Sequence, residues 1–541
     1  MQFTYSPRSF GFIGILILSN IFGTAQSGQP LPYALSPVYL QYLEDLESQV
    51  YELLKNTDAN TLFGKGEDAK LKQNVVVRYL GEYEKSVNRT STTETKYHHE
   101  KDFVSSNPIL AFQMINRYVK YIKNDALKSV TNVLIGKDIL PTEKEVEDAM
   151  EALLRLQYIY DFDAHQIANG MLDGTTTSAK LSIRECFELG KFAQDSAYFT
   201  LALQWYDVAL QKLKTNDEST RAEAAASGLK EHFILNAMRA TIDEHNDDYE
   251  ESIVDGDMYS FSTRIYNTNY SDIAHLTLRK RLMKELAGQV FPDEDPRFIQ
   301  AVEANMMALC LGHNLQTEKE KAKLKCWLDT KRHPFWTINP LKIEQLHEEP
   351  SIIQLYDIFN DKWAEYLKML SYEDLERAPD IPEATPRTAA YAWFEDDDIP
   401  DAPISKMVEF VTGLNVVGSA AAEALQVAAY AFGGHVEPHF DSKGPEDPVE
   451  NPKGDRVTTF LVYLNEVEKG GLTAFPLLGI YIKPVKNSAV LWYTNMKNGD
   501  VDERTIHAAC PVIAGQKWIA TKWTHIKENI LKRPCGLKPE E

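Results

Sequence analysis

Apolar side chains in the first half of the chain recur at steps of three and four residues among charged ones. This spacing places them on one face of a helix, so residues 36–165 are predicted to be largely helical. The clearest stripe contains Tyr39, Leu43, Leu46 and Val50. It fits a coiled-coil dimer seam and an ordinary bundle helix equally well, because no sustained heptad repeat follows.

Residues 178–250 also carry a helical pattern, with small and aromatic side chains at regular positions. The spacing around Leu189-Gly190, Tyr198 and Trp205-Tyr206 resembles a tetratricopeptide unit, in which small residues let two antiparallel helices approach closely. A second, weaker helical pair is expected at 229–255. One clear unit is also compatible with a plain helical hairpin.

From about residue 330 prolines interrupt the helical pattern, and short β-rich runs separated by Gly and Pro follow. A helix is still expected at 405–414, closed by Gly413. Many short strands at near-regular spacing favour a β-sandwich or barrel. The chain is therefore predicted to be an α + β multidomain protein, helical in its first half and β-rich in its last third. Its 541 residues are too many for one core.

Charge and the first apolar run limit the function and the compartment. The net charge of −22 argues against a nucleic-acid binder, which needs excess Lys and Arg to displace counterions. Residues 10–18 are apolar, follow Arg8 and precede small residues, which predicts a signal peptide at 1–27. The run is too short to span a bilayer, so a lumenal chain without a membrane span is expected.

An oxidising lumen makes disulfides expected among the five cysteines. Cys310, Cys326, Cys510 and Cys535 allow three pairings, and the local pairs Cys310–Cys326 and Cys510–Cys535 are favoured because nothing else in the sequence links the two regions. Cys186 is then the unpaired one and reads as a small buried residue. Asn88 and Asn269 lie in glycosylation triplets, which fit a lumenal chain.

The chemistry is carried by the segment GGHVEPHFD at 433–441. Side chains two apart on a strand share a face, so His439 and Asp441 point the same way. The double glycine and Pro438 make irregular geometry expected, so His435 and Glu437 need not share that face. With His507 downstream, the pair forms the 2-His-1-carboxylate arrangement that holds Fe(II) and leaves positions open for a cosubstrate and O₂. Zinc accepts the same ligands, so a hydrolase remains an alternative.

Lys517 favours the oxygenase. A turn at Ala514-Gly515 is expected to form a hairpin that lays the strand of His507 beside the strand of Lys517. A lone ammonium in a barrel interior needs an anion to offset its desolvation, and the distal carboxylate of 2-oxoglutarate meets that need. On its own, Lys517 would instead read as a solvated strand residue.

These motifs resemble those of the α subunit of collagen prolyl 4-hydroxylase. The strongest likenesses are EPHFD at 437–441, GGLTAFP at 470–476, AVLWY at 489–493 and HAACPVIAGQKWIATKW at 507–523. Weaker ones are NPILAFQMINR at 107–117, ALLRLQYIYDFD at 152–163, CFELGK at 186–191 and TGLNV at 412–416.

The resemblance implies a site in which His439, Asp441 and His507 bind Fe(II). Lys517 would pair with the C5 carboxylate of 2-oxoglutarate, assisted by Tyr430 and Thr473. Arg456, Trp523 and His525 match positions that line the peptide channel. The implied reaction converts 2-oxoglutarate to succinate and CO₂ and hydroxylates peptidyl proline at C4, as in procollagen, with L-ascorbate restoring oxidised iron.

The resemblance also implies an assembly and a domain order. The α subunit would pair with protein disulfide isomerase as an α₂β₂ tetramer, which would keep it in the endoplasmic reticulum lumen. The implied parts are a helical dimerisation-type domain at 28–170, a tetratricopeptide-like peptide-binding domain at 171–260, a connecting region at 261–335 and a jelly-roll (double-stranded β-helix) dioxygenase domain at 336–541. The family also pairs its cysteines locally.

The chain departs from the family in its peptide-binding domain. Gln194, Phe233 and Asn236 stand where tyrosines are usual in the groove that receives a polyproline II peptide. Three alternatives therefore stay beside a procollagen hydroxylase: the same chemistry on a non-collagen secreted protein, a catalytically silent peptide-binding subunit, and a zinc hydrolase.

Overall fold

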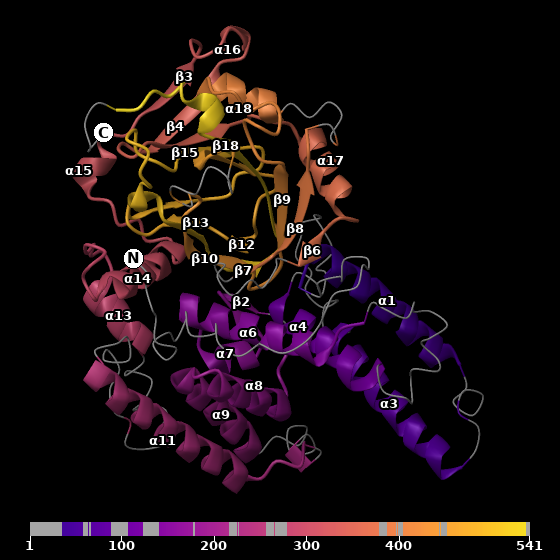
Figure 1. The fold of residues 1–541 in the computed structure, drawn as a ribbon. Coiled ribbons are helices and arrows are strands. Elements are labelled where there is room, and N and C mark those ends of the chain that lie inside the picture. Colours follow the sequence, from indigo (N-terminus) through magenta and orange to yellow (C-terminus); the bar gives the residue numbers. More distant parts are fainter. Residues whose placement is uncertain are drawn as a thin grey trace. The chain divides into compact units, whose positions relative to one another are not determined.

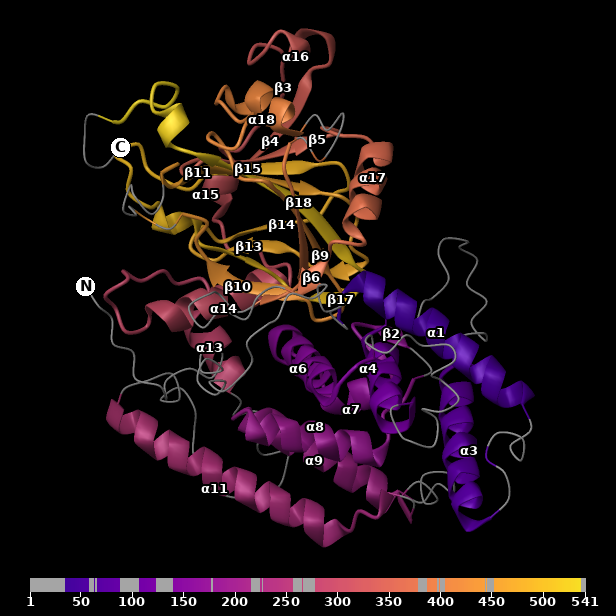
Figure 2. The same cartoon turned by 45° about the vertical axis from the view of Figure 1, so that its right-hand side comes forward.

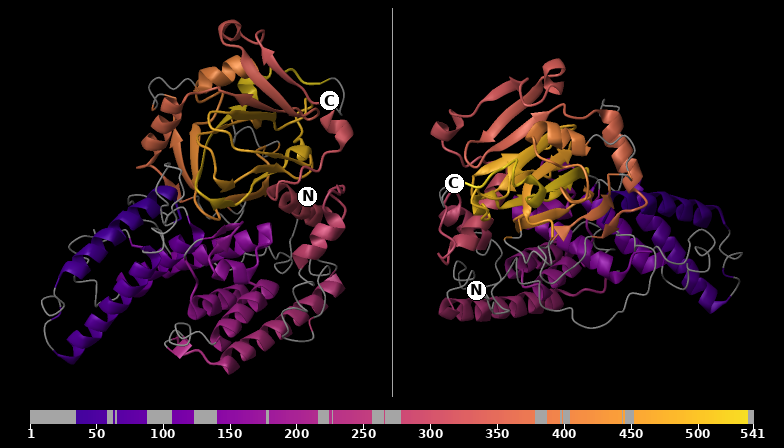
Figure 3. Two further views of the ribbon diagram at one scale, coloured as in Figure 1. Left: turned by 180° about the vertical axis from the view of Figure 1, so that it is seen from behind. Right: turned by 45° about the horizontal axis from the view of Figure 1, so that its top comes forward.

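The computed structural model describes residues 35–57, 63, 66–87, 107–122, 140–176, 179–215, 224–225, 227–255, 265, 278–377, 387–396, 398, 404–442, 444 and 452–536. The predicted signal peptide and the sequons at Asn88 and Asn269 lie outside these residues. The chain divides into two compact units, one built mainly from Val38–Ala287 and Phe291–Ala304 and the other mainly from Asn305–Glu541. Helices make up most of the described part of the first unit, whereas strand residues outnumber helical ones in the second (Figure 3).

The first unit is helical, as the periodicity predicted. Its elements are α1 (Pro37–Asn56), α3 (Glu67–Val87), α4 (Pro108–Arg117), the π-helix η3 (Tyr118–Ile122), α6 (Glu143–Tyr160), α7 (Ala164–Ala168), β1 (Met171–Leu172), β2 (Thr175–Thr176), α8 (Ile183–Asp195), α9 (Phe199–Lys214), α11 (Glu231–Asp255), α13 (Leu278–Leu286) and α14 (Phe298–Cys310), the last of which ends in the second unit. In the part of the chain that is described, no helix is long and apolar enough to cross a membrane.

Two local features explain how helices α8 and α9 form and pack. A capping box joins Ser182 to Glu185 and satisfies the first free amides of α8. A Cβ at Gly190 would lie 2.7 Å from the ring of Tyr206 on α9, so only glycine permits this approach of the two helices (Figure 2). The close approach of two helices through a small residue, expected at this point from the sequence, is therefore present.

The prediction of a helical pair at 229–255 is wrong. The segment forms one continuous helix, α11. It contains neither Gly nor Pro, so nothing in its sequence ends the helix midway.

The second unit contains most of the strands. Its elements are α15 (Glu318–Lys321), β3 (Cys326–Asp329), α16 (Phe335–Ile338), β4 (Leu341–His347), β5 (Ile352–Tyr356), α17 (Asp361–Ser371), β6 (Glu376–Arg377), β7 (Arg387–Thr388), β8 (Ala390–Phe394), α18 (Ile404–Thr412), β9 (Leu425–Tyr430), β10 (His435–His439), β11 (Arg456–Tyr463), β12 (Lys469–Gly470), β13 (Thr473–Phe475), β14 (Ile480–Ile482), β15 (Ala489–Tyr493), η5 (Glu503–Thr505), β16 (His507–Ala509), β17 (Val512–Ala514), β18 (Lys517–His525) and η6 (Lys527–Asn529). Helix α18 ends before Gly413, whose φ is +74°, as expected.

Two antiparallel sheets enclose the core of this unit. The larger has the order β3-β4-β5-β15-β11-β18-β9-β8-β6, and the smaller has the order β14-β13-β16-β10-β7. Strands β15 and β18 lie on one side of the interior, and β13 and β10 lie on the other (Figures 1 and 2). Side chains from both sheets, such as Tyr463, Phe475 and Trp492, share one buried cluster. The arrangement is consistent with the predicted jelly roll.

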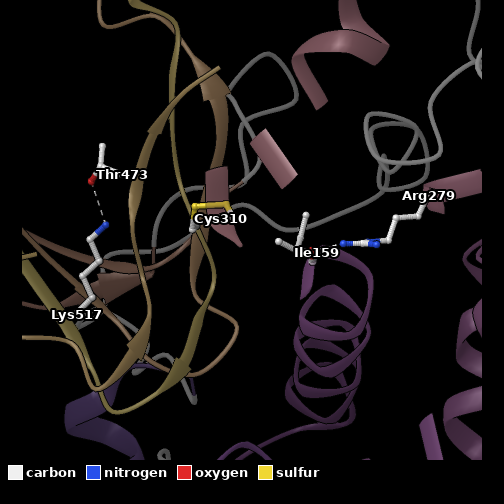
Figure 4. The surroundings of a disulfide bond; sticks show 6 residues. Ile159, Arg279, Cys310, Thr473 and Lys517 are labelled. Atoms are coloured by element: carbon white, nitrogen blue, oxygen red, sulfur yellow. Dashed lines mark hydrogen bonds between the residues drawn. A yellow bond between two sulfur atoms is a disulfide. The ribbon is translucent and has the colours of Figure 1, made fainter. Parts of the chain in front are cut away.

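The predicted cysteine pairing is wrong. Cys310 is bonded to Cys510, with a Cα–Cα distance of 5.5 Å across 200 residues of sequence (Figure 4). Cys326 and Cys535 are exposed free thiols, and Cys186 is buried and is not part of a disulfide, as expected. Cys326 is the first residue of β3 and is held opposite Glu344 in the sheet. The fold, which sequence spacing does not reveal, brings the end of α14 to the segment after β16.

Candidate active site

Three metal-binding side chains converge in the interior of the second unit. One ligand atom of each of His439, Asp441 and His507 lies within 4.8 Å of those of the other two. Nε2 of His507 is 3.6 Å from Oδ2 of Asp441, and Nε2 of His439 is 3.9 Å from Oδ1. The structure thus brings together the three residues that the sequence pointed to, and the donor set fits a facial triad.

A bulge in β10 produces this convergence. Val436 pairs with Ala509 and His439 pairs with His507, so three steps on β10 oppose two on β16. The bulge contains Pro438, which has no amide hydrogen to donate. The irregularity expected from the sequence is present at this strand, and within the described residues His435 and Glu437 are not part of the metal-binding group.

Backbone carbonyls fix which ring nitrogen each histidine presents. Nδ1 of His439 bonds to the carbonyl of Glu437 at 2.8 Å, and Nδ1 of His507 bonds to that of Thr505 at 3.2 Å. Each Nε2 is then left as the ligand atom. Burial and the neighbouring His507 lower the pKa of His439 to about 3, so its imidazole stays neutral and able to ligate.

The carboxylate of Asp441 is held charged and oriented. Burial favours its neutral form, but His507, His439, Arg456 and the Thr459 hydroxyl outweigh it and lower its pKa. Thr459 Oγ1 donates to Oδ2 of Asp441 at 2.6 Å. A charged carboxylate is the form that binds a metal.

Lys517 is buried beside the hydroxyl of Thr473. Its side chain reaches into the interior, and Nζ lies 3.4 Å from Thr473 Oγ1 (Figure 4). Tyr463 bonds to the same oxygen at 2.8 Å, and the ring of Tyr430 lies 5.7 Å from the ammonium. Among the described residues no carboxylate pairs with Lys517, and burial lowers its pKa to about 7. Such a site offers a cation and hydroxyls to an incoming anion.

The route by which Lys517 reaches the site differs from the prediction. The strands of His507 and Lys517 are not side by side, because β16 pairs with β10 and β13 whereas β18 pairs with β11 and β9. Strand β17, between them, pairs with β12. The two strands therefore lie in different sheets, and Thr473 on β13 makes the link, since it pairs with Ala509 and contacts Lys517.

Two adjacent glycines precede β13, and the second of them lies against the side chain of Lys517. Gly470 and Gly471 have φ angles of +75° and +66°. A Cβ at Gly470 would lie 2.5 Å from the carbonyl of Pro511, and one at Gly471 would lie 3.5 Å from the Lys517 side chain. The clash excludes any side chain at Gly470, and the positive φ favours glycine at both positions.

Arg456, Trp523 and His525, predicted for the peptide channel, form one cluster with Glu423. Arg456 makes two hydrogen bonds to Glu423, at 2.6 and 2.8 Å, and lies over the Trp523 ring at 4.0 Å. Nε2 of His525 is 3.3 Å from Glu423. Burial would raise the pKa of Glu423, but His525 and Arg456 lower it to about 2.

Sequence reasoning missed three supporting residues: Glu423, Thr459 and Tyr463. The last two had a detectable signal, because they alternate on the inward face of β11 with Leu461. Glu423 lies in an irregular segment before β9 and had none.

Comparison with known proteins agrees with this geometry. Residues 425–525 match the family model "2OG-Fe(II) oxygenase superfamily", and residues 59–174 match "Prolyl 4-Hydroxylase alpha-subunit, N-terminal region". Prolyl 4-hydroxylase subunit alpha-2 of Gallus gallus is 31% identical over 75% of this chain and 78% of its own length. The chain belongs to the prolyl 4-hydroxylase α-subunit family.

A second relative and a solved structure extend the comparison. Prolyl 4-hydroxylase subunit alpha-2 of Caenorhabditis elegans is 31% identical over 86% of this chain and 87% of its own. The viral collagen prolyl hydroxylase from Paramecium Bursaria Chlorella virus-1 is 24% identical, covers 32% of this chain and 94% of its own, and has a TM-score of 0.25.

Family membership confirms the predicted enzyme class. The protein is a 2-oxoglutarate- and Fe(II)-dependent prolyl 4-hydroxylase, and its cofactors are Fe(II) and 2-oxoglutarate. The membership favours iron over the zinc hydrolase considered from the ligands alone.

Proposed function

We propose that His439, Asp441 and His507 are the iron ligands and that the chain is the α subunit of a procollagen-proline 4-dioxygenase. The observation that supports this most is the pairing of an intact triad with a buried ammonium that has no carboxylate partner among the described residues. A silent peptide-binding subunit would have no need of that costly charge.

Lys517 and Thr473 bind the C5 carboxylate of 2-oxoglutarate, with Tyr430 closing the same pocket. The ammonium and the hydroxyl already lie 3.4 Å apart, so little rearrangement is needed to receive two carboxylate oxygens. When bound, Fe(II) and 2-oxoglutarate together activate O₂ for hydroxylation of proline C4. Thr459 and the two backbone carbonyls hold the ligands in place.

The peptide passes along Trp523, Arg456 and His525. Trp393, 47% exposed, lies 6.0 Å from Trp523, and flat aromatic rings suit the faces of proline. The Glu423 pairing keeps Arg456 and His525 fixed while the peptide binds.

The assembly follows the family's pattern. The chain pairs with protein disulfide isomerase, as α₂β₂, in the endoplasmic reticulum lumen, and L-ascorbate restores oxidised iron. Residues 28–170 serve dimerisation, residues 171–260 form a tetratricopeptide-like peptide-binding domain, residues 261–335 connect and residues 336–541 catalyse. Glycosylation at Asn88 and Asn269 fits the same compartment.

One observation favours a second candidate, the same chemistry on a non-collagen secreted protein. Gln194, where the family usually has tyrosine, donates to both carboxylate oxygens of Glu244 at 3.1 and 2.9 Å and accepts from Tyr206 at 2.9 Å. This position therefore offers a polar group rather than a flat ring to a peptide.

The test is co-expression with protein disulfide isomerase, followed by a panel of collagen-like and unrelated proline peptides read by mass shift. We expect hydroxylation that needs iron and 2-oxoglutarate and is lost in His439→Ala. The exposed His313→Ala is the matched control and should stay active. Faster hydroxylation of the unrelated proline peptides than of the collagen-like ones would favour the second candidate. Equal rates on both peptide classes would remove its basis, and no turnover on any peptide would contradict both candidates.

A further inference from the structure

A polar network lies directly behind the metal-binding residues and is not used by the mechanism above. Its centre is Asp455, half-buried just before β11. Oδ1 of Asp455 accepts from the amide of Arg456 at 2.8 Å. Oδ2 accepts from the hydroxyl of Ser442 and from Nδ2 of Asn495 at 3.0 Å. Asn495 also donates to Ser442 Oγ at 3.1 Å, so Ser442, Asp455 and Asn495 are all bonded to one another, and they are here called the Asp455 network.

The Asp455 network joins three segments that carry functional side chains. Ser442 follows the ligand Asp441 directly. Arg456, the next residue after Asp455, donates to the backbone carbonyl of Asp441 at 3.3 Å and bonds to Glu423. Asn495 bridges to Val501 in the loop that leads through η5 to His507.

Burial makes this network costly to disturb. Ser442 is 6% exposed and Asn495 is 2% exposed, so neither can exchange its partner for water. Loss of the Asp455 carboxylate would free the chain on both sides of the site at once. Asp441 would move first, because the adjacent residue, Ser442, would lose its hydrogen bond to Asp455.

We propose that Asp455 is a positioning residue that sets the geometry of Asp441 and Arg456 through Ser442 and Asn495. The proposal rests on the assignment of Asp441 as an iron ligand. Asp455 does not touch the iron or the cosubstrate and acts through the chain it holds. Partners of this kind behind a ligand change metal affinity or activity by about 10- to 100-fold when they are removed.

The test measures metal binding without catalysis. Mn(II) alone is titrated into the purified full-length complex and free Mn(II) is followed by its EPR signal. We expect Asp455→Ala to weaken Mn(II) binding about 10-fold, with the KM for iron rising more than kcat falls. Asp500→Asn, an exposed carboxylate in the neighbouring loop, removes the same charge and should bind as wild type.

A reciprocal exchange separates positioning from general destabilisation. Both oxygens of Asp455 accept hydrogen bonds, so Asp455→Asn places an NH₂ group against another donor, either the Arg456 amide or Nδ2 of Asn495. Adding Asn495→Asp replaces the second of these donors with an acceptor. The double variant should bind Mn(II) at least about threefold more tightly than either single variant, because the two positions are coupled. Ser442→Ala removes one hydroxyl and serves if Asp455→Ala does not fold.

The outcomes are distinct. Wild-type affinity in both Asp455→Ala and Ser442→Ala would overturn the proposal, and so would a double variant no better than the singles. Failure of the wild-type protein to bind Mn(II) would instead contradict the ligand assignment under the proposed function.

Discussion

The hydroxyl of Thr459 donates to the carboxylate of Asp441 at 2.6 Å, while Thr458, the preceding residue, buries its hydroxyl on the opposite face of β11. Within the described residues Thr458 Oγ1 has no hydrogen-bond partner. Of these two adjacent buried threonines, Thr459 orients a proposed metal ligand and Thr458 does not.

Replacing Thr459 with Val should weaken metal binding about 10-fold, since the hydroxyl is lost while the volume is kept. Titration of the protein with Fe(II) under anaerobic conditions measures this. Thr458→Val is the matched control and should leave affinity unchanged and stability equal or higher, because it removes an unsatisfied buried hydroxyl. Equal affinity in the two variants would contradict the role of Thr459.

Lys517→Met should raise the KM for 2-oxoglutarate about 100-fold or more, because the buried ammonium is the only proposed counter-charge. Lys522, on the other face of β18, is buried and paired with Asp396 at 3.0 Å. Lys522→Met should therefore lower stability and leave this KM unchanged. A similar rise in KM for both variants would show that the effect is not local to the pocket.

The pKa of Lys517 also predicts how stability varies with pH without cosubstrate. Burial lowers the pKa to about 7, below that of an unfolded lysine, so the unfolded chain binds more protons between these values. Lys517 therefore makes the free energy of unfolding rise with pH from about 7 towards 10. Denaturant unfolding at several pH values should show a smaller rise for Lys517→Met than for wild type, and parallel curves would contradict this.

Glu423→Gln should destabilise the protein at neutral pH, by about 2–3 kcal/mol, because it leaves Arg456 without its carboxylate. The pKa of Glu423 is lowered to about 2, so its contribution is complete above the unfolded value near 4.3 and is lost as pH falls towards 2. The difference in the free energy of unfolding between Glu423→Gln and wild type should therefore shrink as the pH falls from about 4.3 to about 2. The exposed Glu528→Gln should show no such difference.

Peptide mapping without reduction should find Cys310 joined to Cys510, with Cys326 and Cys535 open to alkylation. Cys310→Ser and Cys510→Ser should destabilise the second unit equally, by up to about 5 kcal/mol for a loop of this length. Cys326→Ser and Cys535→Ser should have little effect. A fragment joining Cys310 to Cys326 would restore the pairing expected from the sequence.

The sequence predicted that the three proposed iron ligands converge, because the alternation of side chains along a strand and the irregular run GGHVEPH are both visible locally. It predicted that Lys517 is buried for a chemical reason, but misplaced the strand that carries it. Sheet membership depends on long-range pairing, and a turn at Ala514-Gly515 is equally compatible with a hairpin and with a crossing between sheets.

The Cys310–Cys510 disulfide and the role of Glu423 could not be predicted from the sequence, because both depend on contacts between segments that are far apart in the chain. Cys510 is 25 residues from Cys535 but 200 from Cys310, and only the fold decides which thiol lies nearest.

The single helix α11 could have been predicted from the sequence, because the segment contains neither Gly nor Pro to end a helix midway.

Gly471 places main chain rather than a side chain beside Lys517 in the proposed cosubstrate site. Side chains can be exchanged one at a time, whereas this surface can change only if the path of the loop changes. Adaptation to a larger or differently shaped keto-acid would therefore have to begin at a side chain such as Tyr430, whose ring lies 5.7 Å from the Lys517 ammonium, and leave the glycine as it is.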